Sequence, residues 1–323
     1  MKGIRFYSLF FVAVFLGGLP LDGFAQTYPT KAIKVVVPFA AGGSNDLVAR
    51  ALQKPLGKEL KQTIVVENIP AGTTKVGTLE VIKSEPNGYT LLCVGHSPLM
   101  GYYYSGTYDF KVWKKLTVIG QSGEMPYSCV ETRVESPFKT WAELVQHAKK
   151  NPSKMTVGGP GAGGLQNLVA IETAKAAGIE VRYVPFAGGG PSGTAVLGGH
   201  VDYRICPPSE AITNVRAGKT RILGVAYAKR LPELPEVPTF KELGLPGEVP
   251  TLAFDYWGPP DLPQNIVDTF ARALEKALQD PEYRQFCERI IYYPIFKDGP
   301  ALRQEMKWFE ENLGSKLAAF FKK

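Results

Sequence analysis

Two stretches of this chain share one pattern: VVVPFAAGG at residues 35–43 and RYVPFAGGG at residues 182–190. Each is typical of a strand that ends in Pro-Phe-Ala and continues through glycines into a helix. Such a turn exposes unpaired backbone N–H groups and the positive end of a helix dipole, which favour an anion. Glycines that merely permit a tight turn are the alternative for either turn alone. Two matched turns predict a cleft that holds an anion between two lobes.

The rest of the chain alternates short apolar runs with segments that carry a helical apolar face. This alternation predicts an α/β fold with mainly parallel sheets, in which ligands bind at the carboxyl ends of strands. The predicted strands are 33–38, 64–66, 89–94, 154–157, 180–185, 201–206 and 221–226. The predicted helices are 46–60, 77–84, 141–150, 165–177, 191–197 and 209–217, with a helical region from Pro263 onward.

Five prolines interrupt residues 232–250, where we expect little regular structure beyond a short helix at 240–243. The last helix has Asp298 as its expected N-cap and Pro300 in its first turn. An apolar stripe follows at Leu302, Met306, Phe309, Leu313, Leu317 and Phe320. We expect this stripe to pack against a sheet, with a partner-binding helix as the alternative.

Length and charge limit the function classes. The chain has 323 residues, which predicts two domains. Its formal net charge is +7, but the basic residues are scattered among acidic ones along the whole chain. A nucleic-acid surface needs clustered Lys and Arg, so no nucleic-acid partner is expected. The excess is at most a weak indication of anionic partners.

Residues 1–25 have the pattern of a secretory signal peptide. Lys2 and Arg5 precede an apolar run, and small residues precede a predicted cut between Ala25 and Gln26. A membrane anchor, the alternative, needs about 20 apolar residues. Cleavage lowers the formal net charge from +7 to +6, since the segment carries two basic residues and one acidic residue. We expect a periplasmic protein, and no other stretch of the sequence is apolar enough to span a bilayer.

No cofactor or metal site is predicted. The four cysteines allow three pairings that the sequence does not choose between, and buried free thiols are equally compatible with it. Neither CxxC nor HExxH occurs. Residues 159–164 match GxGxxG, but the following strand does not end in the acidic residue that holds a ribose in dinucleotide sites.

No catalytic residue is predicted either. A GxSxG nucleophile turn and a Walker lysine are absent from the sequence. His96 follows a strand and is a candidate for the cleft, with a structural role in the turn as the alternative. His147 and His200 are expected to be structural or at the surface. A secreted hydrolase or lyase remains the alternative function, through residues assembled from distant positions.

Several motifs together resemble one receptor family. They are YPTK at 28–31, VPFAAGGSND at 37–46, VEN at 66–68, PNGYTLL at 86–92, VPFAGGGP at 184–191, GGHVD at 198–202, AKR at 228–230 and VPT at 237–239. With them the chain resembles the Bug-type, TctC-like solute-binding receptors of tripartite tricarboxylate transporters, over nearly the whole mature length.

The resemblance implies a type II periplasmic binding protein fold, in which two α/β lobes enclose a ligand cleft. We place the two crossings of the chain between lobes near residues 126 and 249. Lobe I then consists of residues 26–126 and 250–323, and lobe II of residues 127–249.

It also implies that the turn of lobe I holds a ligand carboxylate through backbone groups and water, while loops of lobe II close on it. The candidate residues in lobe I are Phe39, Ala40, Ala41, Gly42, Gly43, Ser44, Asn45, Asp46, Thr74, Lys75, His96 and Ser97. Those in lobe II are Gly161, Ala162, Gln166, Phe186, Ala187 and Gly188. Asp46 is expected to cap the turn or orient water, because a carboxylate repels a carboxylate.

Two loops depart from the family pattern, at residues 70–75 and 163–167. Lys75 is a candidate partner for a distal ligand carboxylate, with an exposed loop position as the alternative. Residues 102–104 are either the wall of an aromatic-ligand pocket or a lobe surface. The sequence predicts a monomeric receptor for a di- or tricarboxylate, aromatic ligands included, that serves a membrane permease. A ligand sensor for a signalling partner is the alternative.

Overall fold

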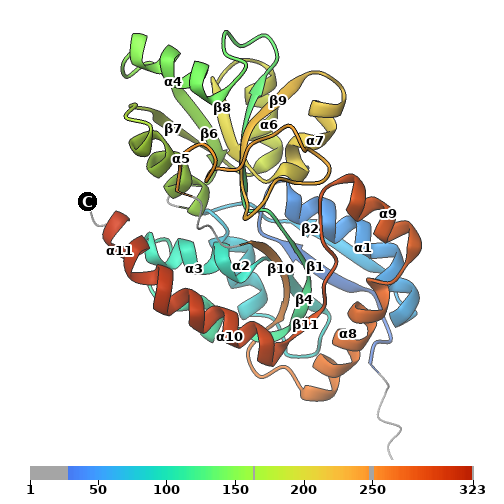
Figure 1. The fold of residues 1–323 in the computed structure, drawn as a ribbon. Coiled ribbons are helices and arrows are strands. Elements are labelled where there is room, and N and C mark those ends of the chain that lie inside the picture. Colours follow the sequence, from blue (N-terminus) through green and yellow to red (C-terminus); the bar gives the residue numbers. More distant parts are fainter. Residues whose placement is uncertain (1–27, 163, 247–250, 322–323) are drawn as a thin grey trace, which may run out of the picture.

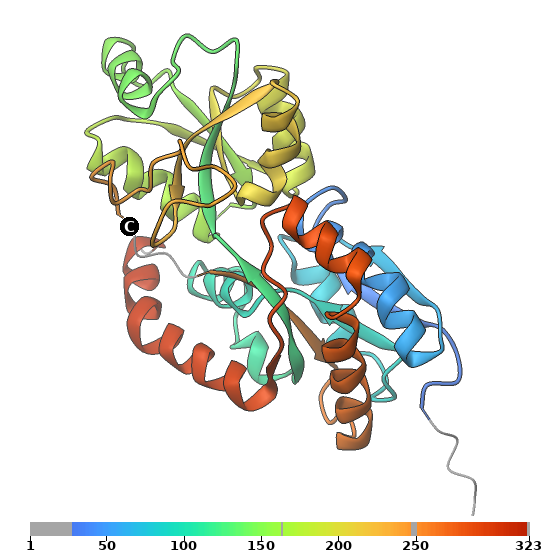
Figure 2. The same ribbon diagram turned by 45° about the vertical axis from the view of Figure 1, so that its right-hand side comes forward.

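The computed structural model describes residues 28–162, 164–246 and 251–321. These residues form two lobes, each built around its own sheet (Figures 1 and 2). The predicted signal peptide, its cut after Ala25 and the predicted crossing near residue 249 lie outside the described residues.

The first lobe holds a six-stranded sheet with the order β11-β4-β10-β3-β1-β2. Its strands are β1 (Ile33–Val37), β2 (Ile64–Asn68), β3 (Thr90–Cys93), β4 (Thr117–Met125), β10 (Leu252–Gly258) and β11 (Lys297–Asp298). Its helices are α1 (Ser44–Leu60), α2 (Lys75–Ile82), α3 (His96–Tyr104), η1 (Val112–Lys114), α8 (Gln264–Ala277), α9 (Pro281–Arg289), α10 (Gly299–Phe309), η2 (Glu310–Gly314) and α11 (Ser315–Phe321).

The second lobe holds a five-stranded sheet with the order β7-β6-β8-β5-β9. Its strands are β5 (Ser128–Arg133), β6 (Thr156–Pro160), β7 (Arg182–Phe186), β8 (Tyr203–Cys206) and β9 (Thr220–Ala226). Its helices are α4 (Trp141–Lys150), α5 (Leu165–Ala176), α6 (Gly189–Leu197) and α7 (Pro208–Arg216).

Both sheets follow one plan, in which all strands run one way except β10 and β5, which follow a crossing, and the edge strand β11. In the first lobe, β10 is antiparallel to β3 and β4, and β11 is antiparallel to β4. In the second lobe, β5 is antiparallel to β8 and β9. The chain changes sheet between β4 and β5 and returns between β9 and β10, so a strand that enters from the other lobe runs against its neighbours. The predicted α/β class is confirmed, but both sheets are mixed: among the described strands, four pairs are parallel and five are antiparallel.

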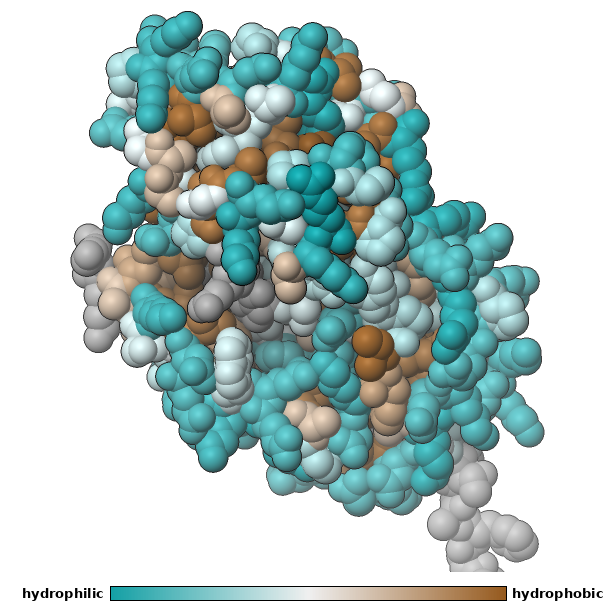
Figure 3. Space-filling view, in the orientation of Figure 1, coloured by the Kyte–Doolittle hydropathy of each residue, from teal (hydrophilic) through white to brown (hydrophobic). Residues whose placement is uncertain are grey.

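Each lobe has its own apolar core. In the first lobe, the β1 residues Ile33, Val35 and Val37 are at most 1% exposed, and the helical face that includes Leu52 and Leu56 covers them. In the second lobe, Val157 and Tyr203 of the central strands are fully buried. No helix in the described part of the chain is long and apolar enough to cross a membrane, and the face in Figure 3 is mostly hydrophilic.

The two turns with the shared sequence occupy different places in this plan. β1 lies inside its sheet between β2 and β3, whereas β7 is the edge strand of the second lobe. The strand that corresponds to β1 by position is β6, which leads into α5 through residues 161–164. The repeated motif therefore does not mark equivalent positions of the two lobes.

Strands β4, β5 and β10 and helix α3 were not predicted. β4 contains Gly120 and Gly123, and its Gln121 and Ser122 are polar yet fully buried. Glycine and buried polar residues are uncommon in strands, so the residue types of β4 do not predict a strand. Residues 240–243 form a hydrogen-bonded turn instead of the expected short helix.

The C-terminal helix matches its prediction. The Asp298 side chain caps α10 by accepting from the Ala301 N–H at 2.9 Å. Leu302, Met306 and Phe309 are buried, and α10 contacts β4, while α11 contacts α3. The π-helical residues 310–314 lie between the two helices. The expected packing of the stripe against a sheet is confirmed for α10.

Truncating the stripe tests this packing. Leu302 is 0% exposed, whereas Trp308 on the same helix is 53% exposed. We expect Leu302→Ala to lower the free energy of unfolding by about 2–5 kcal/mol, because it removes transfer free energy and leaves a cavity. The control Trp308→Ala should change it by about 0.5 kcal/mol or less. Urea unfolding of both variants measures this; equal losses would contradict the described burial.

Candidate functional site

The two glycine turns meet between the lobes. The Ala40 N–H donates to the Ala187 carbonyl at 3.4 Å. A Cβ placed on Gly188 would lie 3.1 Å from the Ala40 nitrogen, and one on Gly190 would collide with the Ala41 carbonyl. Here glycine is required because backbone packs directly on backbone. The contact brings together the turns that the sequence assigned to opposite sides of the cleft.

A small cavity of about 30 Å³ lies beside this contact. It is lined by Phe39, Gly43, Ser44, Asn45, Pro98, Tyr102, Tyr127, Pro160, Leu165, Gln166, Gly189, Pro207, Glu210 and Leu252, which come from both lobes. That volume holds about two water molecules. The space between the lobes at this point is therefore smaller than an organic acid.

The structure places five of the predicted residues on the cavity wall. They are Phe39, Gly43, Ser44, Asn45 and Gln166. The amide oxygen Oδ1 of Asn45 is buried and has no hydrogen-bond partner among the described residues. Ser44 and Asn45 lie in the first turn of α1, so the start of this helix opens directly onto the cavity.

Asp46 fixes the turn of the first lobe from inside. Its Oδ2 accepts from the Gly42 N–H at 2.9 Å, and its Oδ1 accepts from Arg50 Nε at 2.7 Å. The side chain is 5% exposed and is not part of the cavity wall. The bond from Gly42 ties the turn to the first turn of α1, and the bond from Arg50 is an ion pair along the helix.

Glu210 was missed by sequence reasoning. It lies in the first turn of α7, and its Oε1 accepts from the N–H of Ser44 at 2.9 Å and from its Oγ at 2.7 Å. Arg204 Nη1 lies 3.4 Å from Glu210 Oε2. A side chain of the second lobe therefore bonds to the helix start that the sequence assigned to the ligand. A strand followed by PPSE at 207–210 was the available signal, because it puts an acid at a strand-to-helix turn.

Two tyrosines outside the predicted site form part of the wall. Tyr102 is 2% exposed and Tyr127 is 1% exposed. The Tyr127 hydroxyl donates to Gln166 Oε1 at 3.1 Å. Burial raises the pKa of both phenols, so they are neutral at physiological pH. Of residues 102–104, Tyr102 lines the cavity, whereas Tyr103 and Tyr104 do not.

Besides Asp46, twelve other predicted residues lie off the cavity wall, among them the glycine-turn residues Ala40, Ala41, Gly42, Ala187 and Gly188. The Thr74 hydroxyl bonds to Tyr108 at 2.9 Å, and Lys75 lies 3.8 Å from Asp109 with 38% of its side chain exposed. In the second lobe, the Gly161 N–H donates to the Phe186 carbonyl at 2.8 Å, and Ala162 is exposed.

His96 and Ser97 begin α3 and also lie off the wall. Asp255 Oδ2 accepts from the His96 backbone N–H at 2.6 Å and lies 2.8 Å from its Nδ1. His96 is 6% exposed, and the Ser97 hydroxyl is buried without a partner among the described residues. The geometry favours the structural alternative for His96, which ties α3 to β10.

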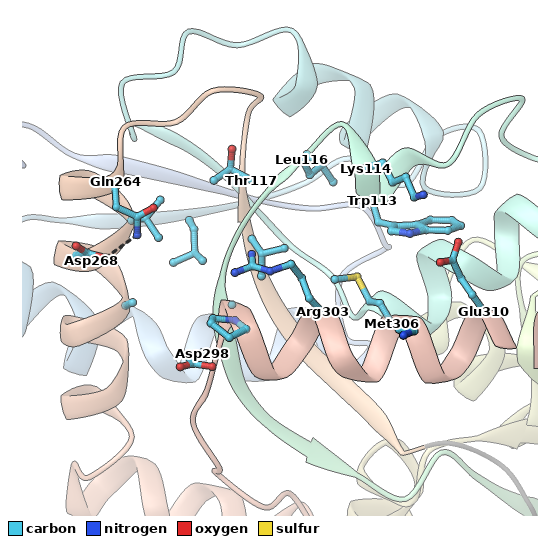
Figure 4. A pocket seen from close by; sticks show the side chains of 17 residues that line it. Trp113, Lys114, Leu116, Thr117, Gln264, Asp268, Asp298, Arg303, Met306 and Glu310 are labelled. Carbon is cyan, nitrogen blue, oxygen red and sulfur yellow. Dashed lines mark hydrogen bonds between the residues drawn. The ribbon is translucent and has the colours of Figure 1, made fainter. Parts of the chain in front are cut away.

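A larger cavity of about 770 Å³ lies within the first lobe, away from the turns. Figure 4 shows its wall, to which Trp113 of η1 and Arg303 and Met306 of α10 contribute. None of the residues predicted for the site lines it. Its position away from the interlobe contact excludes it as the cleft that the turns define.

The four cysteines are all buried and unbridged. Cys129 and Cys206 lie opposite each other on β5 and β8, with sulfur atoms 3.8 Å apart. In residues 28–162, 164–246 and 251–321, no group of three His, Cys, Asp or Glu side chains could hold a metal ion.

The model of the tripartite tricarboxylate transporter family receptor, TctC, matches residues 48–312. The chain belongs to this receptor family. A UPF0065 protein of Agrobacterium vitis is 31% identical over 316 residues, covering 95% of this chain and 90% of the relative. The periplasmic binding protein BugD has a TM-score of 0.82 at 27% identity, covering 91% of this chain and 98% of its own. MatC from Rhodopseudomonas palustris with bound malate has a TM-score of 0.81 at 27% identity, covering 91% and 100%.

Membership of the TctC receptor family identifies the chain as a solute-binding receptor. The family consists of receptors, which removes the hydrolase or lyase alternative. The two-lobed type II fold is likewise confirmed by the solved structures that the chain resembles. In this TctC receptor the cleft carries, in addition, the Glu210 contact to the start of α1.

The His96–Asp255 pair predicts a pH dependence of stability. Burial lowers the pKa of His96, but the carboxylates of Asp255 and Glu305 outweigh burial and the nearby Lys297, so the pKa is raised above its ordinary value. A raised pKa means that the folded protein binds the proton more tightly than the unfolded chain. The resulting stabilisation is complete below about pH 6.5, the unfolded value, and is lost as pH rises through the folded pKa.

We therefore expect wild type to exceed His96→Asn in free energy of unfolding most at pH 6 and progressively less toward pH 9. Urea unfolding at several pH values measures the difference. The exposed His200→Asn serves as control and should show the wild-type pH profile. A difference between wild type and His96→Asn that stays constant or grows with pH would contradict this assignment.

Proposed function

We propose that this chain is a periplasmic receptor that captures a small organic acid between its lobes and delivers it to a membrane permease. The meeting of the two glycine turns beside the interlobe cavity carries the proposal, because the start of α1 there offers helix N–H groups to an anion. Membership of the TctC receptor family supports it, and so does the resemblance to MatC, which was solved with bound malate.

Capture requires the lobes to open and close. The cavity of about 30 Å³ is too small to admit an organic acid, so the ligand enters a more open arrangement. A ligand that touches both lobes then favours the closed state by its extra contacts with the second lobe. The direct contacts between the lobes, such as Ala40 with Ala187, favour the same closed arrangement.

We also propose how the chain is processed and which membrane partner it serves. Signal peptidase would remove residues 1–25, and the mature chain would act as a monomer in the periplasm. The closed surface of the two lobes would dock the permease. The resemblance to TctC-like receptors favours a di- or tricarboxylate, aromatic acids included.

Ligand-induced stabilisation tests the proposal. A ligand that binds only the folded protein at 100 times its Kd raises the free energy of unfolding by about 2.7 kcal/mol. We expect the mature chain, residues 26–323, to show a raised melting temperature with at least one acid from a panel of mono-, di- and tricarboxylates that includes malate. The matched amide or alcohol of that acid, which lacks the carboxylate, should give no shift.

A variant that blocks closure separates binding in the cleft from binding elsewhere. Gly190→Val places a side chain against the Ala41 carbonyl, where no space exists in the closed arrangement. We expect it to fold and to lose the shift. The absence of a shift with every acid on wild type, or an unchanged shift in Gly190→Val, would contradict capture between the lobes.

A further inference from the structure

The Glu210 carboxylate has hydrogen-bond and ion-pair partners within the protein. Its Oε1 accepts two bonds from Ser44, from the N–H at 2.9 Å and from Oγ at 2.7 Å. Arg204 Nη1 lies 3.4 Å from Oε2, and the Glu210 side chain is only 7% exposed. Arg204 itself is 1% exposed and also pairs with Glu131, so this cation is shared between two carboxylates.

Three helix starts converge on this one carboxylate. Glu210 lies in the first turn of α7, and its acceptor bonds come from the first residue of α1. A Cβ on Gly189, at the start of α6, would overlap the Glu210 carboxylate, so this helix start is also adjacent. Helix N-termini favour negative charge, so all three favour a carboxylate at this position. Glu210 thus takes the N–H of Ser44, and the N–H groups of the next residues in the first turn of α1 stay available to one ligand carboxylate.

The cavity wall offers no cation to a second anionic group. Among the described residues that line it, Glu210 is the one with a formal charge, because both tyrosines are neutral. Arg50 is paired with Asp46, and Lys75 lies beside Asp109, off the wall. The wall therefore carries one negative charge among neutral neighbours.

The neutral part of the wall can contact an uncharged portion of the ligand, apart from its carboxylate. Its apolar and aromatic contributions are Phe39, Pro98, Tyr102, Tyr127, Leu165 and Leu252. Two side-chain amides add hydrogen-bonding capacity. Asn45 is 7% exposed and its Oδ1 has no partner in the described part of the chain, while Gln166 is already bonded to Tyr127. Asn45 thus offers a ligand a neutral polar contact.

We propose that Glu210 sets the charge of the ligand: the cleft takes an acid with a single carboxylate and an uncharged, partly apolar body, and it discriminates against di- and tricarboxylates. The inference rests on the proposed function and narrows its ligand class. A second ligand carboxylate would be enclosed near the Glu210 carboxylate, with no free cation among the described residues of the wall. Like charges at close range in an enclosed site repel strongly.

Matched ligand pairs isolate the effect of the second charge. Succinate and succinamate differ by one carboxylate changed to an amide, as do terephthalate and 4-carbamoylbenzoate. We expect wild type to bind the monoamide of the better pair at least about tenfold more tightly than the diacid in calorimetric titrations, a factor that corresponds to about 1.4 kcal/mol. Glu210→Gln keeps the size and one acceptor, and it should bring this ratio close to one.

Two further variants complete the design. Glu282→Gln removes a charge from an exposed ion pair with Lys54 and should leave the wild-type ratio unchanged. Asn45→Asp adds a negative charge to the wall without changing its size, so it should raise the ratio above wild type. Asn45→Asp keeps the inference testable even if Glu210→Gln does not fold, because it leaves the Glu210 contacts in place.

Each outcome decides the inference. Tighter binding of the diacid by wild type would overturn it, as would a ratio that neither Glu210→Gln nor Asn45→Asp changes. A shift of the ratio in the expected directions supports it. If wild type binds no acid at all, the proposed carboxylate receptor fails and the inference falls with it. That result differs from tight binding without charge discrimination, which would leave the receptor intact.

Discussion

The start of helix α1 must meet an acceptor when the lobes close, because its backbone N–H groups have no partner within the helix. In this protein the acceptor is the carboxylate of Glu210, which reaches Ser44 from the other lobe. Arg204 and the start of α6 hold the carboxylate in place. The bare backbone contact between the two glycine turns lies beside it, and the cavity wall includes both Ser44 and Glu210.

This constraint explains how a cleft with few charged side chains can still select by charge. Neutral groups form nearly the whole wall, so a single fixed negative charge dominates its electrostatics. The formal net charge of the chain has the opposite sign, and its basic residues are scattered along the whole sequence. The long-range field thus attracts anions in general, whereas Glu210 restricts how much negative charge the enclosed ligand brings.

Helical periodicity and helix caps in the sequence predicted several helices close to their observed bounds. Periodicity located α4 at its observed bounds and α5 within one residue, and the Asp298 cap located the start of α10. Strand β4 was not predicted, because Gln121 and Ser122 are residue types typical of loops. In the structure they are buried in a strand that pairs with β10. The glycine turns were found from sequence, but Glu210 was not, since it lies 166 positions from Ser44 and only the closed fold brings them together.

The distance between lobes tests capture by closure most directly. Spin labels on Lys149→Cys in α4 and Lys276→Cys in α8 would report it, because both positions are exposed and all four native cysteines are buried. We predict that electron paramagnetic resonance shows a longer or broader distance distribution for the mature protein alone. The acid that raises the melting temperature should convert it to one short, narrow distance. A distribution that saturating acid leaves unchanged would contradict the account.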